Sequence, residues 1–139
     1  MTEEQRMVAE FHRTFDIAEE TVPTVQDEAI RSLRIRLIQE EFDELQEALG
    51  RRDAVAVAKE LADLLYVVYG TAVSCGIDME PVFREVHRSN MSKVGGHKRA
   101  DGKWVKPPTY SPARLEPILV AQGKDGGRPA SQNPHREGE

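Results

Sequence analysis

The side chains of this chain best suited to chemistry are carboxylates in two short clusters. The first cluster contains Glu40, Glu41 and Glu44, and the second contains Glu60 and Asp63. Fifteen residues separate Glu44 from Glu60, which is enough for one helix to end near a glycine and for another to run back beside it. Two antiparallel helices of this kind would bring all five carboxylates to one place.

The first cluster interrupts an apolar helix face. With ~3.6 residues per turn, the apolar side chains between residues 30 and 49 recur at the i, i+3, i+4 spacing of a buried face. Glu41 and Glu44 fall within this arc and Glu40 lies at its margin, whereas Asp43 and Glu47 point outward. Acidic runs on helices are usually solvated, but this placement favours a buried cluster.

The second cluster lies in a segment with very little charge. Between Ala54 and Cys75 the only charged residues are Lys59, Glu60 and Asp63. A helix that is apolar on nearly all sides is usually buried, and residues three apart share one face. Buried carboxylates repel one another and lose hydration, so either some are protonated or cations lie among them. Mg²⁺, or alternatively Mn²⁺, suits such a set of oxygen ligands.

Composition favours one small helical domain. The chain has 139 residues, of which 39% are hydrophobic and 31% charged, and its net charge of -5 gives no general surface for nucleic acid. Residues 40–63 hold eight acids against three bases, whereas residues 93–106 hold five bases against one acid. An acidic site with a basic loop suits a metal-bound polyphosphate better than a membrane or a duplex.

Cysteine usage and the hydrophobic segments indicate a cytoplasmic protein. The single cysteine, Cys75, lies in an apolar run, which fits a reducing compartment. The first residues lack the basic and apolar regions of a secretory signal. The apolar run from Leu64 to Cys75 is shorter than the about 20 residues that cross a bilayer, so we expect no membrane contact.

The hydrophobic pattern predicts an all-α bundle of about four main helices. The first opens at a capping box that begins with Thr2, and the second runs from about Thr24 to Gly50. The third covers residues 54–75 and the fourth about 79–93.

The remainder of the chain is less regular. A short hairpin is expected about Asp101 and Gly102, and Ser111 followed by Pro112 predicts the start of a short turn or helix. Glycine, proline and polar residues then dominate. We predict one domain over residues 1–120 and a disordered tail over residues 121–139.

Basic and amide side chains near the end of the fourth helix are candidates for binding phosphate. Asn90 and Lys93 are three residues apart near the end of its apolar face. Lys98, Arg99 and Lys103 flank the expected hairpin and could reach phosphate oxygens. The alternative is an ordinary solvated basic loop.

The acidic clusters together resemble a known signature. Glu40, Glu41 and Glu44 match the first half of Glu-Glu-x-x-Glu, spacer, Glu-x-x-Asp, and Glu60 and Asp63 match the second. This signature belongs to the all-α nucleoside triphosphate pyrophosphohydrolases, the superfamily of MazG, dimeric dUTPases and phosphoribosyl-ATP pyrophosphohydrolases. The two halves with a fitting spacer are fairly specific, whereas either half alone is weak.

Other segments extend the resemblance. Residues 60–70, 86–93 and 100–103 are similar to the MazG-like, phosphoribosyl-ATP pyrophosphohydrolase-like branch, in which a Deinococcus-type protein prefers dUTP. The histidine-biosynthesis enzyme itself is less similar around the core. The likeness covers roughly Phe11 to Leu119.

The resemblance implies a nucleoside triphosphate pyrophosphohydrolase that converts dUTP to dUMP and pyrophosphate. Water would attack the α-phosphorus with help from metal ions. The resemblance implies that Glu40, Glu44, Glu60 and Asp63 are metal ligands. Glu41 is either a further ligand or the base that takes the proton of the water.

The resemblance also implies roles for the basic residues and for oligomerisation. Asn90 and Lys93 would contact sugar or phosphate, while Lys98, Arg99 and Lys103 would close over the leaving pyrophosphate. Sites of this family are usually completed by dimerisation, so we expect a homodimer or a dimer of dimers.

Three other functions remain as alternatives. One is a broad house-cleaning hydrolase of non-canonical nucleotides. Another is a non-catalytic helical interaction module. A ferritin-like di-iron bundle would need Glu-x-x-His motifs, and no Glu in this chain has a His three residues later.

Overall fold

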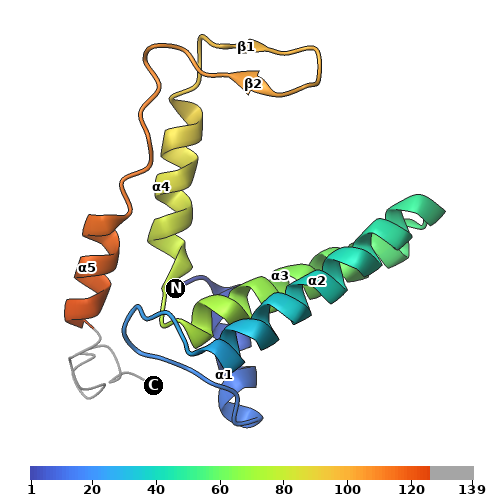
Figure 1. Ribbon diagram of the computed structural model, residues 1–139, viewed down its shortest axis with the longest axis vertical. Helices are drawn as coiled ribbons and strands as arrows, with labels where there is room; N and C mark the ends of the chain where they lie inside the picture. The colour runs from blue at the N-terminus through green and yellow to red at the C-terminus, as the bar shows by residue number, and fades with distance from the viewer. Residues whose placement is uncertain (126–139) are drawn as a thin grey trace, which may run out of the picture.

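The computed structural model describes residues 1–125, and most of these residues are helical, which confirms the predicted all-α class. Figure 1 shows α2 and α3 as a long antiparallel pair that forms one arm, and α4 leaving the end of α3 to form a second arm. The β1–β2 hairpin lies at the far end of α4, and α5 lies beside α4 (Figure 1). The elements in chain order are α1 (Glu3–Thr14), α2 (Glu28–Arg51), α3 (Ala54–Ser74), α4 (Met79–Met91), β1 (His97–Lys98), β2 (Trp104–Val105) and α5 (Glu116–Asp125).

Side-chain caps fix where four of the helices begin. The Thr2 hydroxyl accepts a hydrogen bond from the backbone N–H of Gln5, as the capping box predicts. Asp27, Asp53 and Asp78 cap α2, α3 and α4 in the same way, since each accepts from backbone N–H groups of the following first turn. The caps satisfy donors that have no partner inside the helix.

The predicted start of α2 at Thr24 is wrong, because the helix begins at Glu28. The backbone N–H of Thr24 donates to the carbonyl of Cys75 at 2.8 Å, and its hydroxyl donates to the carbonyl of Val22 at 2.8 Å. Thr24 therefore fastens the preceding loop to the end of α3, and Asp27 serves as the cap.

The turn between α2 and α3 also differs from the prediction at Gly50. Gly50 stays helical, and α2 ends at Arg51. Arg52 adopts the left-handed conformation, with φ of 56°, and its N–H donates to carbonyls of the last helical turn. Asp53 then caps α3, so the reversal takes only two residues.

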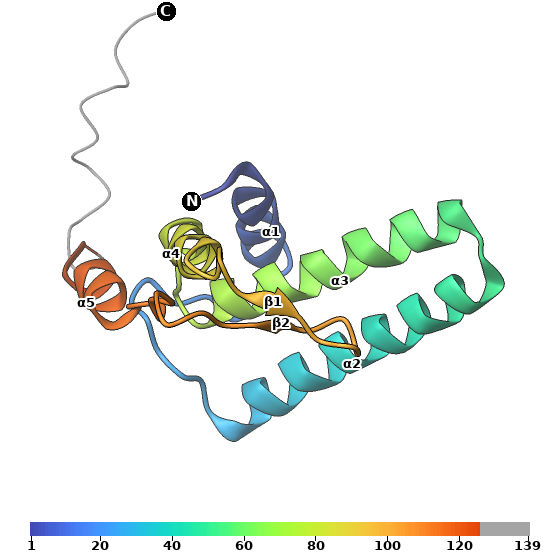
Figure 2. The same cartoon turned by 90° about the horizontal axis from the view of Figure 1, so that it is seen from above.

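A small core holds α1 against α3. Val8, Ala9 and Val73 are buried together, and Tyr69 packs against them. Figure 2 shows α3 between α1 and α2, in agreement with this packing. His12, for which sequence favours a packed or surface position, is almost fully buried, and its Nδ1 donates to the carbonyl of Ala18 at 3.0 Å. Burial lowers the pKa of His12 below its usual value.

A buried arginine links α2 to α3. The guanidinium of Arg34 donates from Nε to the Thr71 hydroxyl at 3.2 Å and from Nη2 to the Val67 carbonyl at 2.9 Å. Gly70 makes room for it, since a Cβ at position 70 would lie 2.2 Å from Arg34 Nη2 and 3.0 Å from His12 Nε2. The close packing of α1, α2 and α3 at this level therefore depends on the missing side chain.

Two glutamines hold the bend between α3 and α4, which is 114°. The buried Gln5 side chain donates to the Ile77 carbonyl at 2.7 Å and accepts from the Met79 N–H at 3.0 Å. Gln122 of α5 accepts from the Asp78 N–H at 3.0 Å and donates to the Asp78 carbonyl at 2.9 Å. We call residues 76–79 with these two glutamines the elbow.

The C-terminal segment departs from the sequence prediction. Ser111 and Pro112 do not start a helix. They pack instead on α4, where Arg88 donates to the Ser111 hydroxyl at 3.1 Å and to the Pro112 carbonyl at 3.0 Å. α5 extends to Asp125, so residues 121–125 of the expected tail are helical. The rest of that tail, residues 126–139, lies outside the described residues.

Large apolar side chains remain exposed on both arms of this single chain. They include Leu61, Leu65 and Val68 of α3 and Phe83 of α4. The prediction that α3 is buried on nearly all sides is therefore not met within one chain. Over residues 1–125 no single helix is long and apolar enough to cross a membrane, although α3 and α4 together reach that length and hydropathy across their bend.

We predict that Gly70→Ala destabilises the protein by about 1–3 kcal/mol, because the added methyl group displaces the Arg34 guanidinium from the Val67 carbonyl. Chemical denaturation measures this change. Gly50→Ala is the matched control, since a Cβ there meets nothing within 4 Å and alanine favours the helix by up to about 1 kcal/mol. Equal effects of the two substitutions would contradict the packing role of Gly70.

Candidate active site

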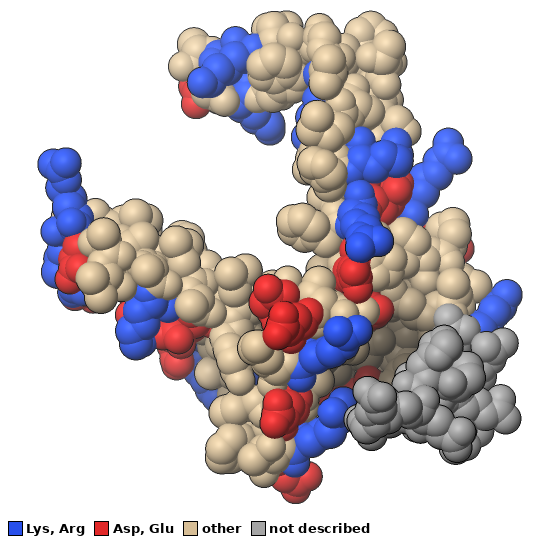
Figure 3. Space-filling model, turned by 180° about the vertical axis from the view of Figure 1, so that it is seen from behind, with Lys and Arg blue, Asp and Glu red and all other residues tan. Residues whose placement is uncertain are grey.

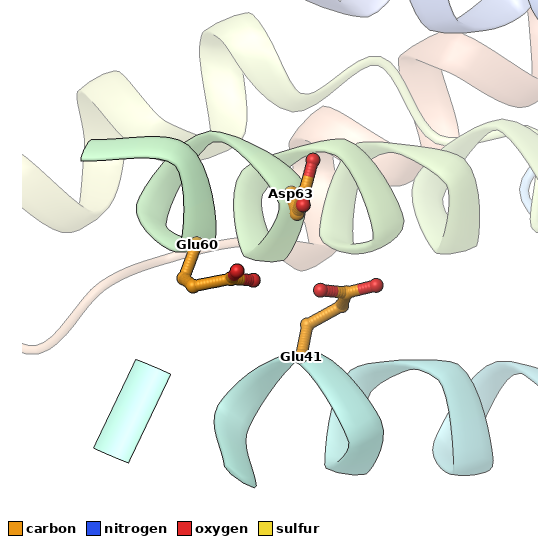
Figure 4. A group of neighbouring side chains, drawn as sticks. All are labelled: Glu41, Glu60 and Asp63. Carbon is orange, nitrogen blue, oxygen red and sulfur yellow. The ribbon is translucent and has the colours of Figure 1, made fainter. Parts of the chain in front are cut away.

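Three carboxylates converge where the middle of α2 faces the first half of α3. Glu41 extends from α2 toward Glu60 and Asp63 of α3 (Figure 4). Each of the three offers an oxygen, and these oxygens all lie within 4.8 Å of one another. Glu60 and Asp63 meet Glu41 because residues three apart on a helix share a face.

Two carboxylate oxygens at the centre of this group are shielded from water, and no hydrogen-bond donor among the described residues replaces it. Within residues 1–125, Glu41 Oε2 and Glu60 Oε2 are buried and have no hydrogen-bond partner. The pKa of Glu41 is raised, first by burial and then by the charges of Glu44, Asp63 and Glu60. A buried carboxylate oxygen without a donor is costly, so the group favours either a proton or a bound cation.

Glu44 joins the group from the same helix. A hydrogen bond with Glu60 is the main cause that raises the pKa of Glu44, followed by the charge of Glu60. Two carboxyl groups can share such a bond only when one of them carries a proton. Glu44 is exposed, so water screens its repulsion with Glu60 more than the repulsion among the three central carboxylates.

Lys59 is the one basic side chain that the structure places in an ion pair with this cluster, among residues 1–125. Its Nζ lies 2.5 Å from Asp63 Oδ2 and 3.7 Å from Glu60 Oε1, and Asp63 raises the pKa of Lys59. Lys59 is 67% exposed, so it screens the edge of the cluster. It leaves the buried oxygens of Glu41 and Glu60 without a partner.

Glu40 lies outside the convergent group. It is exposed on α2 and is absent from the three residues whose oxygens converge. Neighbouring residues on a helix are rotated by about 100°, so Glu40 points to one side of the direction in which Glu41 faces α3. The structure thus brings together Glu41, Glu44, Glu60 and Asp63 and leaves Glu40 outside the group, and the metal-ligand role of all five remains a prediction.

The cluster fits a hard divalent cation. Carboxylate oxygens are the ligands that Mg²⁺ and Mn²⁺ prefer. Among the described residues, the two buried oxygens without a hydrogen-bond donor and the raised pKa of Glu41 favour the binding of positive charge, as a proton or as a cation. Glu41, Glu60 and Asp63 are the residues that could hold the ion.

The candidate phosphate-binding residues lie on the other arm. Lys93 Nζ donates to Asn90 Oδ1 at 2.7 Å at the end of α4. The predicted hairpin is present, with Lys98 paired to Trp104 and Gly102 in its turn at φ of 88°. Beyond Lys98, the basic residues of this hairpin are Arg99, which pairs with Asp101, and Lys103, which is exposed.

Within one chain the two halves of the predicted site do not meet. Figure 3 shows an open gap between the Lys- and Arg-bearing end of the hairpin and the α2–α3 arm. Figure 1 shows the same separation from the opposite side. The structure therefore brings the carboxylates together without Asn90, Lys93, Lys98, Arg99 and Lys103.

Sequence reasoning missed two aromatic residues beside Lys93. The indole Nε1 of Trp104 donates to the Lys93 carbonyl at 2.7 Å. The ring of Tyr110 lies 4.4 Å from Lys106 Nζ and 5.9 Å from Lys93 Nζ. A hydrogen bond with Ser89 is the main cause that lowers the pKa of Tyr110. The sequence feature that could have pointed to this region is a single tryptophan within a basic, glycine-containing loop.

Comparison with known proteins identifies the family. The family model of phosphoribosyl-ATP pyrophosphohydrolase matches residues 8–90. This match covers more than half of the chain, and the chain therefore belongs to that family, which is part of the MazG-like all-α pyrophosphohydrolase superfamily. The predicted superfamily is confirmed. No curated protein matches the chain.

The residues that the family model matches determine which parts of the structure the comparison covers. It contains α2, α3 and most of α4, including all the converging carboxylates, and it ends at position 90. Family membership supports pyrophosphohydrolase activity on nucleotide-like substrates. The β1–β2 hairpin lies beyond the match.

We predict that Glu41→Gln raises the melting temperature of the metal-free protein at pH 7.5. The folded-state pKa of Glu41 is raised, so the folded chain binds this proton more tightly than the unfolded chain. The stabilising effect of the proton is complete below the ordinary pKa and is lost as pH rises through the raised value. The difference between variant and wild type should therefore vanish near pH 4 and grow toward neutral pH.

The control for this measurement is Glu47→Gln, which removes the same charge from an exposed position paired with Arg51. It should give no stabilisation at pH 7.5. Adding Mg²⁺ should raise the melting temperature of the wild type and raise that of Glu41→Gln less. A metal-free Glu41→Gln protein that melts at or below the wild-type temperature at pH 7.5 would exclude a strained carboxylate cluster.

Proposed function

We propose that this protein is a metal-dependent nucleoside triphosphate pyrophosphohydrolase that cleaves between the α- and β-phosphates, with dUTP as its substrate and dUMP and pyrophosphate as products. The observation that carries this proposal is the convergence of Glu41, Glu60 and Asp63, with two buried oxygens that have no donor among residues 1–125. Membership in a pyrophosphohydrolase family supports the same chemistry.

The carboxylates have two tasks in this reaction. Glu40, Glu44, Glu60 and Asp63 are the proposed ligands of Mg²⁺, with Mn²⁺ as an alternative. A divalent ion held there neutralises phosphate charge and makes a bound water more acidic. Glu41 is either a further ligand or the general base.

The bond changes follow from attack at the α-phosphorus. The oxygen of water forms a bond to Pα, and the bond from Pα to the bridging oxygen of the β-phosphoryl group breaks. The proton of the water passes to Glu41 in its role as base, and pyrophosphate leaves with the bonding electrons. Positioning and charge stabilisation supply most of the catalysis in such reactions.

The basic residues would reach the carboxylates of a second copy. The gap between the two arms separates them within one chain, and the exposed apolar residues of α3 and α4 leave surface for a partner. We therefore include a homodimer, or a dimer of dimers, in the proposal. Asn90 and Lys93 of one copy would contact sugar or phosphate at the other, and Lys98, Arg99 and Lys103 would close over pyrophosphate.

Two other substrates must be compared with dUTP. The matching family favours phosphoribosyl-ATP, which contains the same triphosphate linkage next to a larger base. A broad house-cleaning hydrolase would accept non-canonical nucleotides of several kinds. Both alternatives use the carboxylate cluster in the same way, so only a substrate panel separates them.

We predict that the wild type with Mg²⁺ converts dUTP to equal amounts of dUMP and pyrophosphate, and that Glu41→Gln lowers kcat about 10²–10⁴-fold. In ¹⁸O-labelled water the label should enter dUMP, because attack occurs at Pα. Label in pyrophosphate would mean attack at the β-phosphorus. Glu47→Gln, exposed and outside the cluster, should keep wild-type activity.

The same assay, run with dUTP, dCTP, a modified nucleotide and phosphoribosyl-ATP, tests specificity through kcat/KM. A clear preference for dUTP supports the proposal. Preference for phosphoribosyl-ATP would assign the activity of the matched family, and similar values throughout would assign the house-cleaning function. No turnover of any substrate with either Mg²⁺ or Mn²⁺ would leave a binding module.

We predict that two impaired variants complement each other when co-expressed. Glu41→Gln lacks a carboxylate and Lys93→Ala lacks a cation from the opposite arm. If one site uses both copies, a statistical mixture of dimers should recover about a quarter of wild-type activity. Absence of recovery, with dimers shown by light scattering, would place both residues in the same chain's site.

A further inference from the structure

Trp104 presents an exposed aromatic ring next to the candidate phosphate-binding residues. The side chain is 44% exposed and borders a shallow hollow of about 300 Å³. We call this the Trp104 hollow. The residues that line it are Asn90, Met91, Lys93, Val94 and Trp104.

The indole ring is held in a fixed position. Its Nε1 donates to the Lys93 carbonyl at 2.7 Å, and its backbone pairs with Lys98 in the hairpin. The ring lies close over Gly96, where an added Cβ would be 2.6 Å from Trp104 Nε1 and 2.0 Å from the Val105 carbonyl. Because the one polar atom of the ring is used internally, the ring can offer a ligand only its π surface.

Positive charge and an amide lie beside this ring. The Lys93 ammonium donates to Asn90 Oδ1 at 2.7 Å and lies 5.9 Å from the centre of the Tyr110 ring. Lys106 lies 4.4 Å from the same ring. The rigid face of Trp104 lies next to the Lys93 ammonium and the Asn90 amide, and this combination has the chemistry that binds a nucleotide, since the base stacks and the phosphates pair with the cation.

We propose that Trp104 stacks on the nucleobase of the substrate, with Asn90 and Lys93 turned toward its sugar and phosphates. This inference rests on the proposed function, which it extends from the triphosphate to the base. Every base has a π face, so stacking supplies affinity without choosing among bases. Discrimination between uracil and other bases therefore requires hydrogen bonds to the base from other residues.

The experiment uses the fluorescence of the wild-type full-length protein. Trp104 is the single tryptophan of the chain, so its emission reports on this position alone. The protein with Mg²⁺ is titrated with α,β-imido-dUTP, which resists cleavage between the α- and β-phosphates, and separately with inorganic tripolyphosphate, which has no base. Saturable quenching by the nucleotide, with little change from tripolyphosphate or from Mg²⁺ alone, is the expected result.

Kinetics provide a second measurement. Trp104→Ala should raise KM for dUTP about tenfold with a smaller change in kcat, and Trp104→Phe, which keeps an aromatic face, should restore most of the affinity. Circular dichroism and melting temperature establish that each variant is folded. A folded Trp104→Ala protein with wild-type KM would overturn the inference.

The remaining outcomes separate this inference from the proposed function. Nucleotide quenching without any hydrolysis would support base stacking while the hydrolase proposal fails. Hydrolysis with unchanged Trp104 emission would retain the hydrolase and reject the stacking. Equal quenching by tripolyphosphate would also reject the stacking. Emission that changes with protein concentration rather than with nucleotide concentration would reject it as well, because a second copy of the chain would then cover the Trp104 hollow.

Discussion

Repulsion among carboxylates held at a helix–helix contact is the constraint on which the functional part of this structure depends. Glu41 on α2 and Glu60 and Asp63 on α3 face one another because the two helices are antiparallel and in contact. The same packing that buries Ala48 completely also removes water from Glu41 Oε2 and Glu60 Oε2. The helix pair therefore stores an electrostatic cost that a divalent cation, or a proton, relieves.

The protein must offset this electrostatic cost although its own hydrophobic core is small. The buried apolar cluster consists of Val8, Ala9 and Val73. Many of the other contacts between the helices are hydrogen bonds. Arg34 joins α2 to α3 by bonds to Thr71 and to a backbone carbonyl. Small folds with such limited cores usually gain stability from association, which agrees with the apolar surface left exposed on α3 and α4.

The parts predictable from sequence were those with local causes. The α2–α3 pair follows from helical periodicity on either side of a short capped turn. The inward direction of Glu41 follows from its place in the apolar arc, and the shared face of Glu60 and Asp63 follows from their spacing of three residues. The start of α2 was missed because Thr24 and Asp27 are both good caps, and the choice depends on the long-range bond from Thr24 to Cys75. The sequence predicted only a short turn or helix from Ser111, whereas α5 begins at Glu116 and tolerates Pro117 because a proline in the first turn loses no helical hydrogen bond.

A small change of angle at the elbow moves the hairpin at the far end of α4 through a larger distance. The side-chain amides of Gln5 and Gln122 both form hydrogen bonds with the backbone of residues 77–79, although the two residues come from opposite ends of the described chain. α4 has 13 residues, about 20 Å of rigid lever at 1.5 Å per residue. A tilt of about 10° at this pivot would carry the hairpin some 3 Å sideways. Two uncharged side chains at the base of α4 therefore influence where Lys93 and Trp104 lie relative to the α2–α3 arm.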